Sequence, residues 1–123
     1  MMRSWSILDS VIVTKWERTK MQAILIDPFK EDITEMDWDG DALSIAKILG
    51  CKWITGAYPP DMDHDVIYVD DEGLYVEDQR YFFIEGYPHP LAGYGLILGT
   101  DEVGDAIPPK SNINDIAKRL SFI

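Results

Sequence analysis

The residues best suited to chemistry form an acidic cluster, Asp61-Met-Asp-His-Asp65, followed at a distance by Glu72. Counted from Asp61, carboxylates occupy positions 1, 3, 5 and 12, which is the ligand spacing of an EF-hand calcium loop. That loop needs glycine at position 6 for its sharp turn, and here the residue is Val66. We therefore expect a solvated acidic loop in which Asp61, Asp63 and Asp65 are candidate ligands of a surface cation.

The sequence gives little support for a zinc site, a catalytic nucleophile or a phosphate-binding loop. The two histidines, His64 and His89, and the single cysteine, Cys51, do not have the spacing of a zinc site. No Gly-x-Ser-x-Gly motif occurs, and the glycine-rich run at 93–99 lacks the Gly-Lys-Ser/Thr of a phosphate-binding loop. We expect no cofactor, and we interpret these glycines as positions of close strand packing.

Aromatic side chains offer a different kind of site. The chain has four tryptophans and six tyrosines in 123 residues, more than one core hides easily. Because Trp and Tyr anchor interfaces, some of them should line a partner or self-association surface. Tyr58, Tyr87 and Tyr94, together with His89 in the loop Gly86–Pro90, are the candidate binding residues. The alternative is that all the aromatics belong to the core.

A β-hairpin over Asp65–Val76 is the expected centre of the fold. Val66–Val69 and Leu74–Val76 alternate apolar and polar residues, and Gly73 between them could supply the positive φ of a hairpin loop. An isolated hairpin is only marginally stable, so Val66, Tyr68 and Leu74 or Val76 should bury one face. The acidic turn before Gly73 should be solvated.

Periodicity and capping signals predict the other elements. The expected strands are Ala23–Ile26 with its hairpin partner Ile33–Trp38, then Lys52–Thr55, Arg80–Glu85 and Tyr94–Leu98 as the last strand. One helix, capped by Asp39 and ended by Gly50, carries Ala42, Ile45, Ala46 and Leu49 on its apolar face; another, capped by Asn112, directs Ile113, Ile116, Ala117 and Leu120 inward. This pattern predicts an α+β fold with one antiparallel or mixed sheet of five to seven strands and two helices packed on it.

Charge and length divide the chain into an N-terminal extension, residues 1–20, and a single α+β domain, residues 21–123. The net charge is −11; residues 1–20 carry four basic and two acidic residues, which leaves −13 on the rest. Such acidity disfavours direct nucleic-acid binding, and no apolar run is long enough for a membrane span. One cysteine suits a reducing cytoplasm. The extension predicts a strand at Ser10–Trp16 or, alternatively, a helix at Trp5–Val13, and its apolar load favours a homodimer.

From Gln22 to Asp105 the chain resembles a family of short uncharacterised proteins found in phages and mobile elements. The resemblance rests on the first two expected strands, the first helix, the turn Ile67-Tyr-Val-Asp-Asp-Glu-Gly73 and the strand Leu91-Ala-Gly-Tyr-Gly-Leu-Ile-Leu-Gly99. The extension and the final helix lie outside it. The resemblance implies a phage or prophage gene acting in a bacterial cytoplasm, and it carries over no catalytic residue.

Three functions are compatible with these observations. The acidic surface, the surplus aromatics and the missing catalytic motifs favour a non-enzymatic binding protein that engages a host or phage protein, possibly a basic one. The first alternative is a small-ligand binder of a nucleotide or signal, with a pocket formed in a dimer by the loop at 87–90 and the strand at 93–99. The second is a metal-dependent enzyme using Asp61, Asp63, His64 and Asp65.

Overall fold

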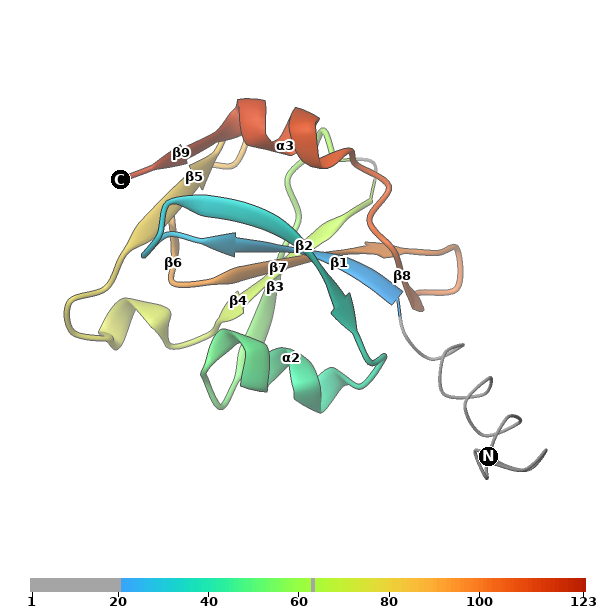
Figure 1. Cartoon of the computed structure of the whole chain (residues 1–123), viewed down its shortest axis with the longest axis horizontal. Coiled ribbons are helices and arrows are strands. Elements are labelled where there is room, and N and C mark those ends of the chain that lie inside the picture. The colour runs from blue at the N-terminus through green and yellow to red at the C-terminus, as the bar shows by residue number, and fades with distance from the viewer. Residues whose placement is uncertain (1–20, 63) are drawn as a thin grey trace, which may run out of the picture.

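Two antiparallel sheets organise the part of the chain that the structure describes, residues 21–62 and 64–123 of a computed structural model (Figure 1). The elements follow in the order β1 (Met21–Asp27), β2 (Asp32–Trp38), α2 (Ala42–Leu49), β3 (Ile54–Ala57), β4 (Val66–Asp70), the 3-10 helix η1 (Gly73–Tyr75), β5 (Tyr81–Ile84), β6 (Leu91–Ala92), β7 (Gly95–Thr100), β8 (Ala106–Ile107), α3 (Ile113–Arg119) and β9 (Leu120–Phe122). The large sheet has six strands, in the order β2-β1-β7-β4-β3 with β8 beside β7. The small sheet has the order β6-β5-β9. The predicted α+β class is confirmed.

The first hairpin forms as its alternating sequence predicts. β1 and β2 pair over their full length, from Met21 opposite Trp38 to Asp27 opposite Asp32. Proline after Asp27 cannot donate to the ladder, and the Asp27 carboxylate closes the turn by accepting main-chain hydrogen bonds from residues 29 and 30. β1 then pairs with β7 on its other side, so this hairpin forms one end of the large sheet.

The helix α2 forms where its apolar spacing predicts, but its cap differs from the expected one. Asp41, not Asp39, is the N-cap, and its side chain accepts a hydrogen bond from the N–H of Leu43. Because the helix begins at Ala42, Asp39 lies too far upstream to cap it and instead accepts from Ser44 Oγ at 2.7 Å. Gly50 ends the helix with φ 69°, the left-handed conformation that glycine adopts without strain.

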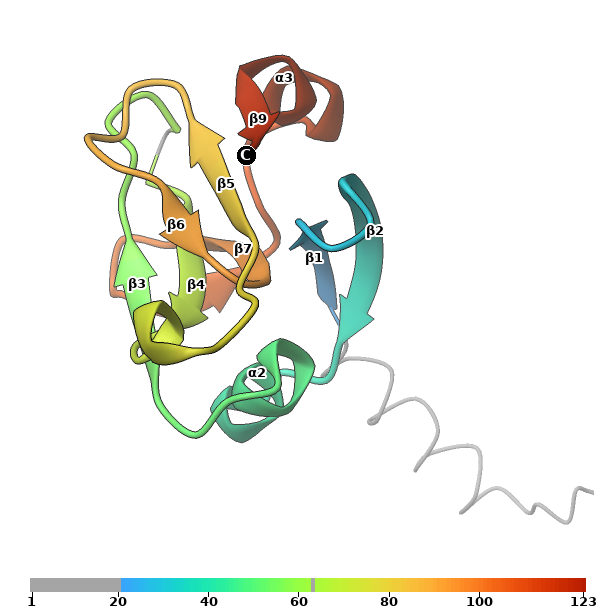
Figure 2. The ribbon, with the colours of Figure 1, turned by 90° about the vertical axis from the view of Figure 1, so that its left-hand side faces the viewer.

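The large sheet carries an apolar core on each face because residues alternate along its strands. Figure 2 shows α2 on one side of the sheet, with the small sheet and α3 on the other. The α2 side buries Ala23, Trp38, Ile45, Leu49, Val66, Leu96 and Leu98. The opposite side buries Ile24, Ile26, Ala57, Met62, Ile67, Val69, Phe82, Ile84, Leu91, Ile97 and Ile116. Each face of the sheet thus carries packed elements.

The predicted central hairpin is wrong. Its first strand exists as β4, but β4 lies between β3 and β7, so both of its edges are occupied. The second predicted strand does not form. Its residues Leu74 and Tyr75 belong to η1, and Leu74, Tyr75 and Val76 are exposed. Gly73 has no positive φ; it lies against Ala92, whose Cβ would be 3.1 Å from an added Gly73 Cβ. Val66 is buried as expected, and it faces α2.

The remaining predictions are partly confirmed. β5 alternates as expected, with Phe82 and Ile84 buried. The predicted strand at 52–55 lies two residues later as β3, and the predicted last strand extends to Thr100 and is followed by β8 and β9. Asn112 caps α3 as predicted, whereas Ala117 is exposed and Leu120 begins β9. The predictions for residues 1–20 lie outside the described residues.

Candidate functional site

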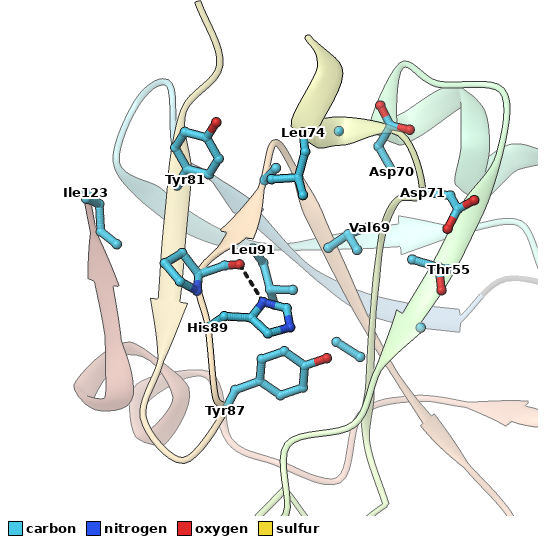
Figure 3. A pocket seen from close by; sticks show the side chains of 15 residues that line it. Thr55, Val69, Asp70, Asp71, Leu74, Tyr81, Tyr87, His89, Leu91 and Ile123 are labelled. Carbon is cyan, nitrogen blue, oxygen red and sulfur yellow. Dashed lines mark hydrogen bonds between the residues drawn. The ribbon is translucent and has the colours of Figure 1, made fainter.

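A pocket of about 710 Å³ lies between the end of the large sheet and the small sheet (Figure 3). One wall is formed by β3 and β4, the other by the loop before β6 and by β6 itself. The turn after β4, η1 and the chain end at Ile123 complete it. The lining residues are Thr55, Gly56, Ala57, Val69, Asp70, Asp71, Gly73, Leu74, Tyr81, Tyr87, His89, Pro90, Leu91, Ala92 and Ile123. The volume is in the range of small-molecule sites, about 300–1,000 Å³.

The pocket wall is mainly apolar with polar groups in a few places. Nine of the 15 lining residues have no polar side-chain atom. Alternation along β3 and β4 directs Thr55, Ala57 and Val69 to the same face, because Thr55 pairs with Val69. Leu91 approaches this face from the small sheet. An apolar body bound here would lose contact with water on several sides.

Tyr87 and His89 form the aromatic part of the wall. Their rings meet edge to face, with centroids 5.0 Å apart. The Nδ1 atom of His89 lies 3.0 Å from the carbonyl oxygen of Pro90. Since a carbonyl only accepts, Nδ1 carries the proton, and in the neutral ring Nε2 is an acceptor. Figure 3 shows this second nitrogen on the ring edge that faces β3 and β4.

The opposite wall carries two carboxylates at the end of β4. One oxygen of Asp70 accepts a hydrogen bond from the N–H of Glu72. Burial, and after it the charge of the Asp70 carboxylate, raises the pKa of the Cys51 thiol. Asp71 is exposed, as predicted for this turn; its N–H donates to the carbonyl of Trp53, and its carboxylate lies beside Thr55 in Figure 3. The lining contains no lysine or arginine, so the pocket has a negative potential.

The structure brings together two of the four predicted binding residues. Tyr87 and His89 line the pocket, whose described wall comes from a single chain. Tyr58 does not line it and is 67% exposed. Tyr94 packs against Phe29, with ring centroids 5.3 Å apart, and borders the core on the α2 side. The strand at 93–99 does not contribute to the pocket either.

The predicted cation ligands have other surroundings. Asp65 is buried, and its two carboxylate oxygens accept hydrogen bonds from the N–H groups of Lys110 and Ser111 at 2.9 and 2.8 Å. Asp61 is exposed, and Asp63 lies outside the described residues. Within residues 21–62 and 64–123, no three His, Cys, Asp or Glu side chains are grouped to hold a metal ion. Asp65 therefore connects two segments of the fold.

Comparison with known families identifies the chain. A model of the domain of unknown function DUF3846 matches residues 21–121. The chain belongs to the DUF3846 family. No curated protein and no solved structure gives a match to it. The match includes α3, which lies outside the region of resemblance from Gln22 to Asp105, and it confirms a family of unknown function. In the described part of this DUF3846 protein, no helix is both long and apolar enough to cross a membrane.

Sequence reasoning missed most of the wall of this DUF3846 pocket. Thr55, Val69 and Leu91 look like ordinary strand residues, because what makes them lining residues is the approach of two sheets that are distant in sequence. The sequence indicates Asp70 and Asp71 only as part of a solvated turn. These two aspartates stand between two apolar runs of the sequence, and this position is the one signal that predicts a charged group beside an apolar wall.

Proposed function

We propose that this DUF3846 protein is a non-enzymatic binding protein whose pocket takes an organic ligand that is neutral or positively charged. The observation that supports the proposal most directly is the pocket itself, with its apolar wall, one aromatic pair and two carboxylates. Pockets with this composition hold a ligand by burial and orient it with a few polar groups.

Charge selects among ligand classes. The lining has two aspartates and no lysine or arginine, and the whole chain carries a net charge of −11. A nucleotide or another phosphorylated signal would meet like charge on entering, without a basic side chain in the wall to compensate. The pocket therefore suits ligands without negative charge better than a nucleotide.

Binding of N-phenyl-1-naphthylamine, a neutral dye that fluoresces in apolar surroundings, tests the proposal. Thr55 is exposed on the pocket face of β3, so Thr55→Trp should fill the pocket. Thr34→Trp, at an exposed position of the edge strand β2, is the matched control. We expect wild type and Thr34→Trp to bind the dye and Thr55→Trp to bind about tenfold more weakly, the effect of losing roughly 1.4 kcal/mol.

Dye binding is compared only between proteins that unfold cooperatively, because an unfolded variant would lose the pocket for another reason. If the wild-type protein leaves the dye fluorescence unchanged, or if Thr55→Trp binds the dye as tightly as the wild type, the proposal is overturned. Circular dichroism of both variants shows whether each one has kept its fold, so that unfolding is not mistaken for a filled pocket.

A second candidate function is binding of a basic segment of another protein. The observation in its favour is an exposed apolar rim next to the pocket: Trp53 is 64% exposed, Leu74 73% and Tyr75 85%. Trp53 lies at this rim because its carbonyl accepts a hydrogen bond from the N–H of Asp71, which lines the pocket. Exposed apolar patches and aromatic anchors are typical of protein interfaces.

The acidic residues around this rim make a basic segment its complement. The test is capture from a bacterial lysate at low salt by the wild type and by Tyr75→Ser, followed by identification of the retained proteins. A basic protein retained by the wild type and lost with Tyr75→Ser supports this function. Retention that is equal for both proteins counts against it.

A further inference from the structure

We infer that the pocket takes an apolar side chain of an extended, basic segment of another protein, whose main chain pairs with the open edge of β3. This inference rests on the proposed function and specifies its ligand as a peptide strand. It follows from the main-chain groups along β3, from their position at the pocket and from the contrast between the two ends of the large sheet.

The main chain of β3 has one side without a partner strand. Among the described residues, β3 pairs only with β4, at one end of the large sheet (Figure 2). The N–H of Asp71 donates to the carbonyl of Trp53, so these two residues form a hydrogen-bonded pair. Such pairs alternate along an antiparallel ladder. Thr55 therefore also bonds to β4, whereas the N–H and C=O groups of Ile54 and Gly56 point away from it.

These open main-chain groups lie at the pocket. Gly56 lines the pocket although it has no side chain, so its main chain forms part of the wall. Its neighbours Thr55 and Ala57 direct their side chains to the pocket face. A strand added beside β3 would continue this alternation and place every second side chain on the same face. One ligand strand can therefore bond to β3 and fill the pocket at the same time.

The edge at β3 differs from the opposite edge of the same sheet. Sheet edges that must stay unpaired often carry charged residues, which keep other strands away. β2 does so with Asp32, Glu35 and Asp37. β3 has the uncharged sequence Ile-Thr-Gly-Ala, and the exposed aromatic residues Trp53 and Tyr58 stand at its two ends. Such an edge suits strand addition, in which main-chain bonds supply affinity and pockets for alternate side chains supply specificity.

Charge sets the preferred sequence of the added strand. Asp70 and Asp71 line the pocket at the end of β4, and the described lining has no lysine or arginine. The whole chain carries a net charge of −11. A second copy, with the same net charge, would be repelled, whereas a segment with lysine or arginine near its apolar residue is attracted. The added strand is therefore basic and belongs to another protein.

A synthetic peptide of alternating apolar and polar residues tests the inference. The parent probe is acetyl-Lys-Val-Thr-Leu-Thr-Lys-amide, in which Val and Leu fall on one face of an extended strand and both Thr on the other. We expect it to displace N-phenyl-1-naphthylamine from the wild-type protein, because one of its apolar side chains occupies the pocket. The acidic counterpart, with glutamate in place of both lysines, should compete about tenfold more weakly.

N-methylation shows whether the main chain of the peptide pairs with β3. Successive residues of a strand direct their N–H groups to opposite sides, so only every second N–H can bond to β3. One derivative is N-methylated at Val and Leu, and the other at both Thr. We expect one of them to bind about tenfold more weakly than the other, because only one loses its donors to β3. Loss with methylated Thr indicates an antiparallel strand, and loss with methylated Val and Leu a parallel one.

Substitutions at Ile54 test the same contact from the side of the protein. Its N–H points away from β4, so Ile54→Pro removes a donor of the open edge and spares the ladder; proline is tolerated at the first residue of a strand and on edge strands. Ile54→Val trims the side chain, keeps the N–H and is the matched control. We expect Ile54→Pro to bind the parent peptide about fivefold more weakly than Ile54→Val, while both variants bind the dye.

Hydrogen exchange provides a test that needs no variant. In the wild-type protein the N–H of Gly56 should exchange more slowly when the parent peptide is bound, because it then donates to the peptide main chain. The N–H of Thr55, which bonds to β4 with and without the peptide, is the internal reference. Unchanged exchange at Gly56 under saturating peptide would contradict strand pairing.

The results separate this inference from the proposed function. If the dye binds but the parent peptide does not displace it at up to about 1 mM, or if the two N-methylated derivatives bind equally, the inference is overturned and the pocket stays a site for small organic ligands. A cooperatively unfolding Ile54→Pro variant that binds the peptide as tightly as Ile54→Val also overturns it. If the dye itself does not bind, the proposed function fails, and the inference that rests on it fails too.

Discussion

Replacement of Asp65 by asparagine should destabilise the protein by about 2–4 kcal/mol, because this carboxylate holds two distant segments together. Asp65 is 1% exposed. Its oxygens accept from the N–H groups of Lys110 and Ser111, which precede α3. The hydroxyl of Ser111 also approaches the carbonyl of Met62 at 3.4 Å. The carboxylate thus attaches the segment that leads into α3 to the loop before β4.

The magnitude follows from what asparagine can replace. Its oxygen can keep one of the two hydrogen bonds, now with a neutral acceptor, at a loss of about 1 kcal/mol. Its NH₂ group would face the other main-chain N–H, so a bond to a charged acceptor, worth about 1.5–3 kcal/mol, disappears and a buried donor lacks a partner. All buried polar side-chain atoms of the described residues now have partners, so the substitution introduces a defect that the fold does not otherwise contain.

Urea unfolding followed by tryptophan fluorescence measures the change. The slope of free energy against urea should stay the same, and the midpoint should fall. Hydrogen exchange at the amides of Lys110 and Ser111 should become faster in the variant. Asp71→Asn is the control; it lies in the exposed acidic turn and should change the free energy of unfolding by no more than about 0.5 kcal/mol. A loss below about 0.5 kcal/mol for Asp65→Asn would refute the two buried hydrogen bonds.

Three further predictions concern single sites. Burial raises the pKa of the Cys51 thiol, so iodoacetamide should alkylate it at pH 8 more slowly than an exposed peptide cysteine. The hydrogen bond from Ser44 is the main cause that lowers the pKa of Asp39. The ionised Asp39 carboxylate therefore contributes to stability above pH 3.8, and this contribution is lost as the pH falls through the lowered pKa. In an NMR titration Ser44→Ala should raise that pKa. Gly95→Ala would place a Cβ 2.8 Å from the buried ring of Phe82, and urea unfolding should show a loss of about 1–3 kcal/mol.

The sequence predicts those elements whose partners are close along the chain. The first hairpin and α2 are found from alternation, from the proline after Asp27 and from the helical spacing that ends at Gly50, because each of these signals acts within a few residues. The predicted helix cap, Asp39, is two residues away from the observed cap, Asp41. This is an error in the boundary of the helix and not in its existence. β6 and β8 have two residues each, too few for a periodic pattern to show.

The candidate site was less predictable, because it depends on distant contacts. The sequence indicates Tyr87 and His89 by residue type, but Tyr58 and Tyr94 have the same type as Tyr87 and lie elsewhere. No spacing in the sequence distinguishes these pairs. Asp65 shows the converse: it resembled a solvated ligand in an acidic loop, yet the segment that covers it is 45 residues away.

The failed hairpin and the pocket have one structural origin. β4 is paired on one edge with β3 and on the other with β7, so the chain after Asp70 cannot fold back onto β4 as a hairpin partner, and it leaves the sheet. It turns through η1, where Gly73 fits closely against Ala92, and returns as β5 and β6 over the face that it has just left. β3 has four residues and β6 only two, so the two sheets meet along part of this face. The uncovered part is the pocket, and the acidic turn that the sequence assigned to a hairpin loop becomes its negatively charged wall.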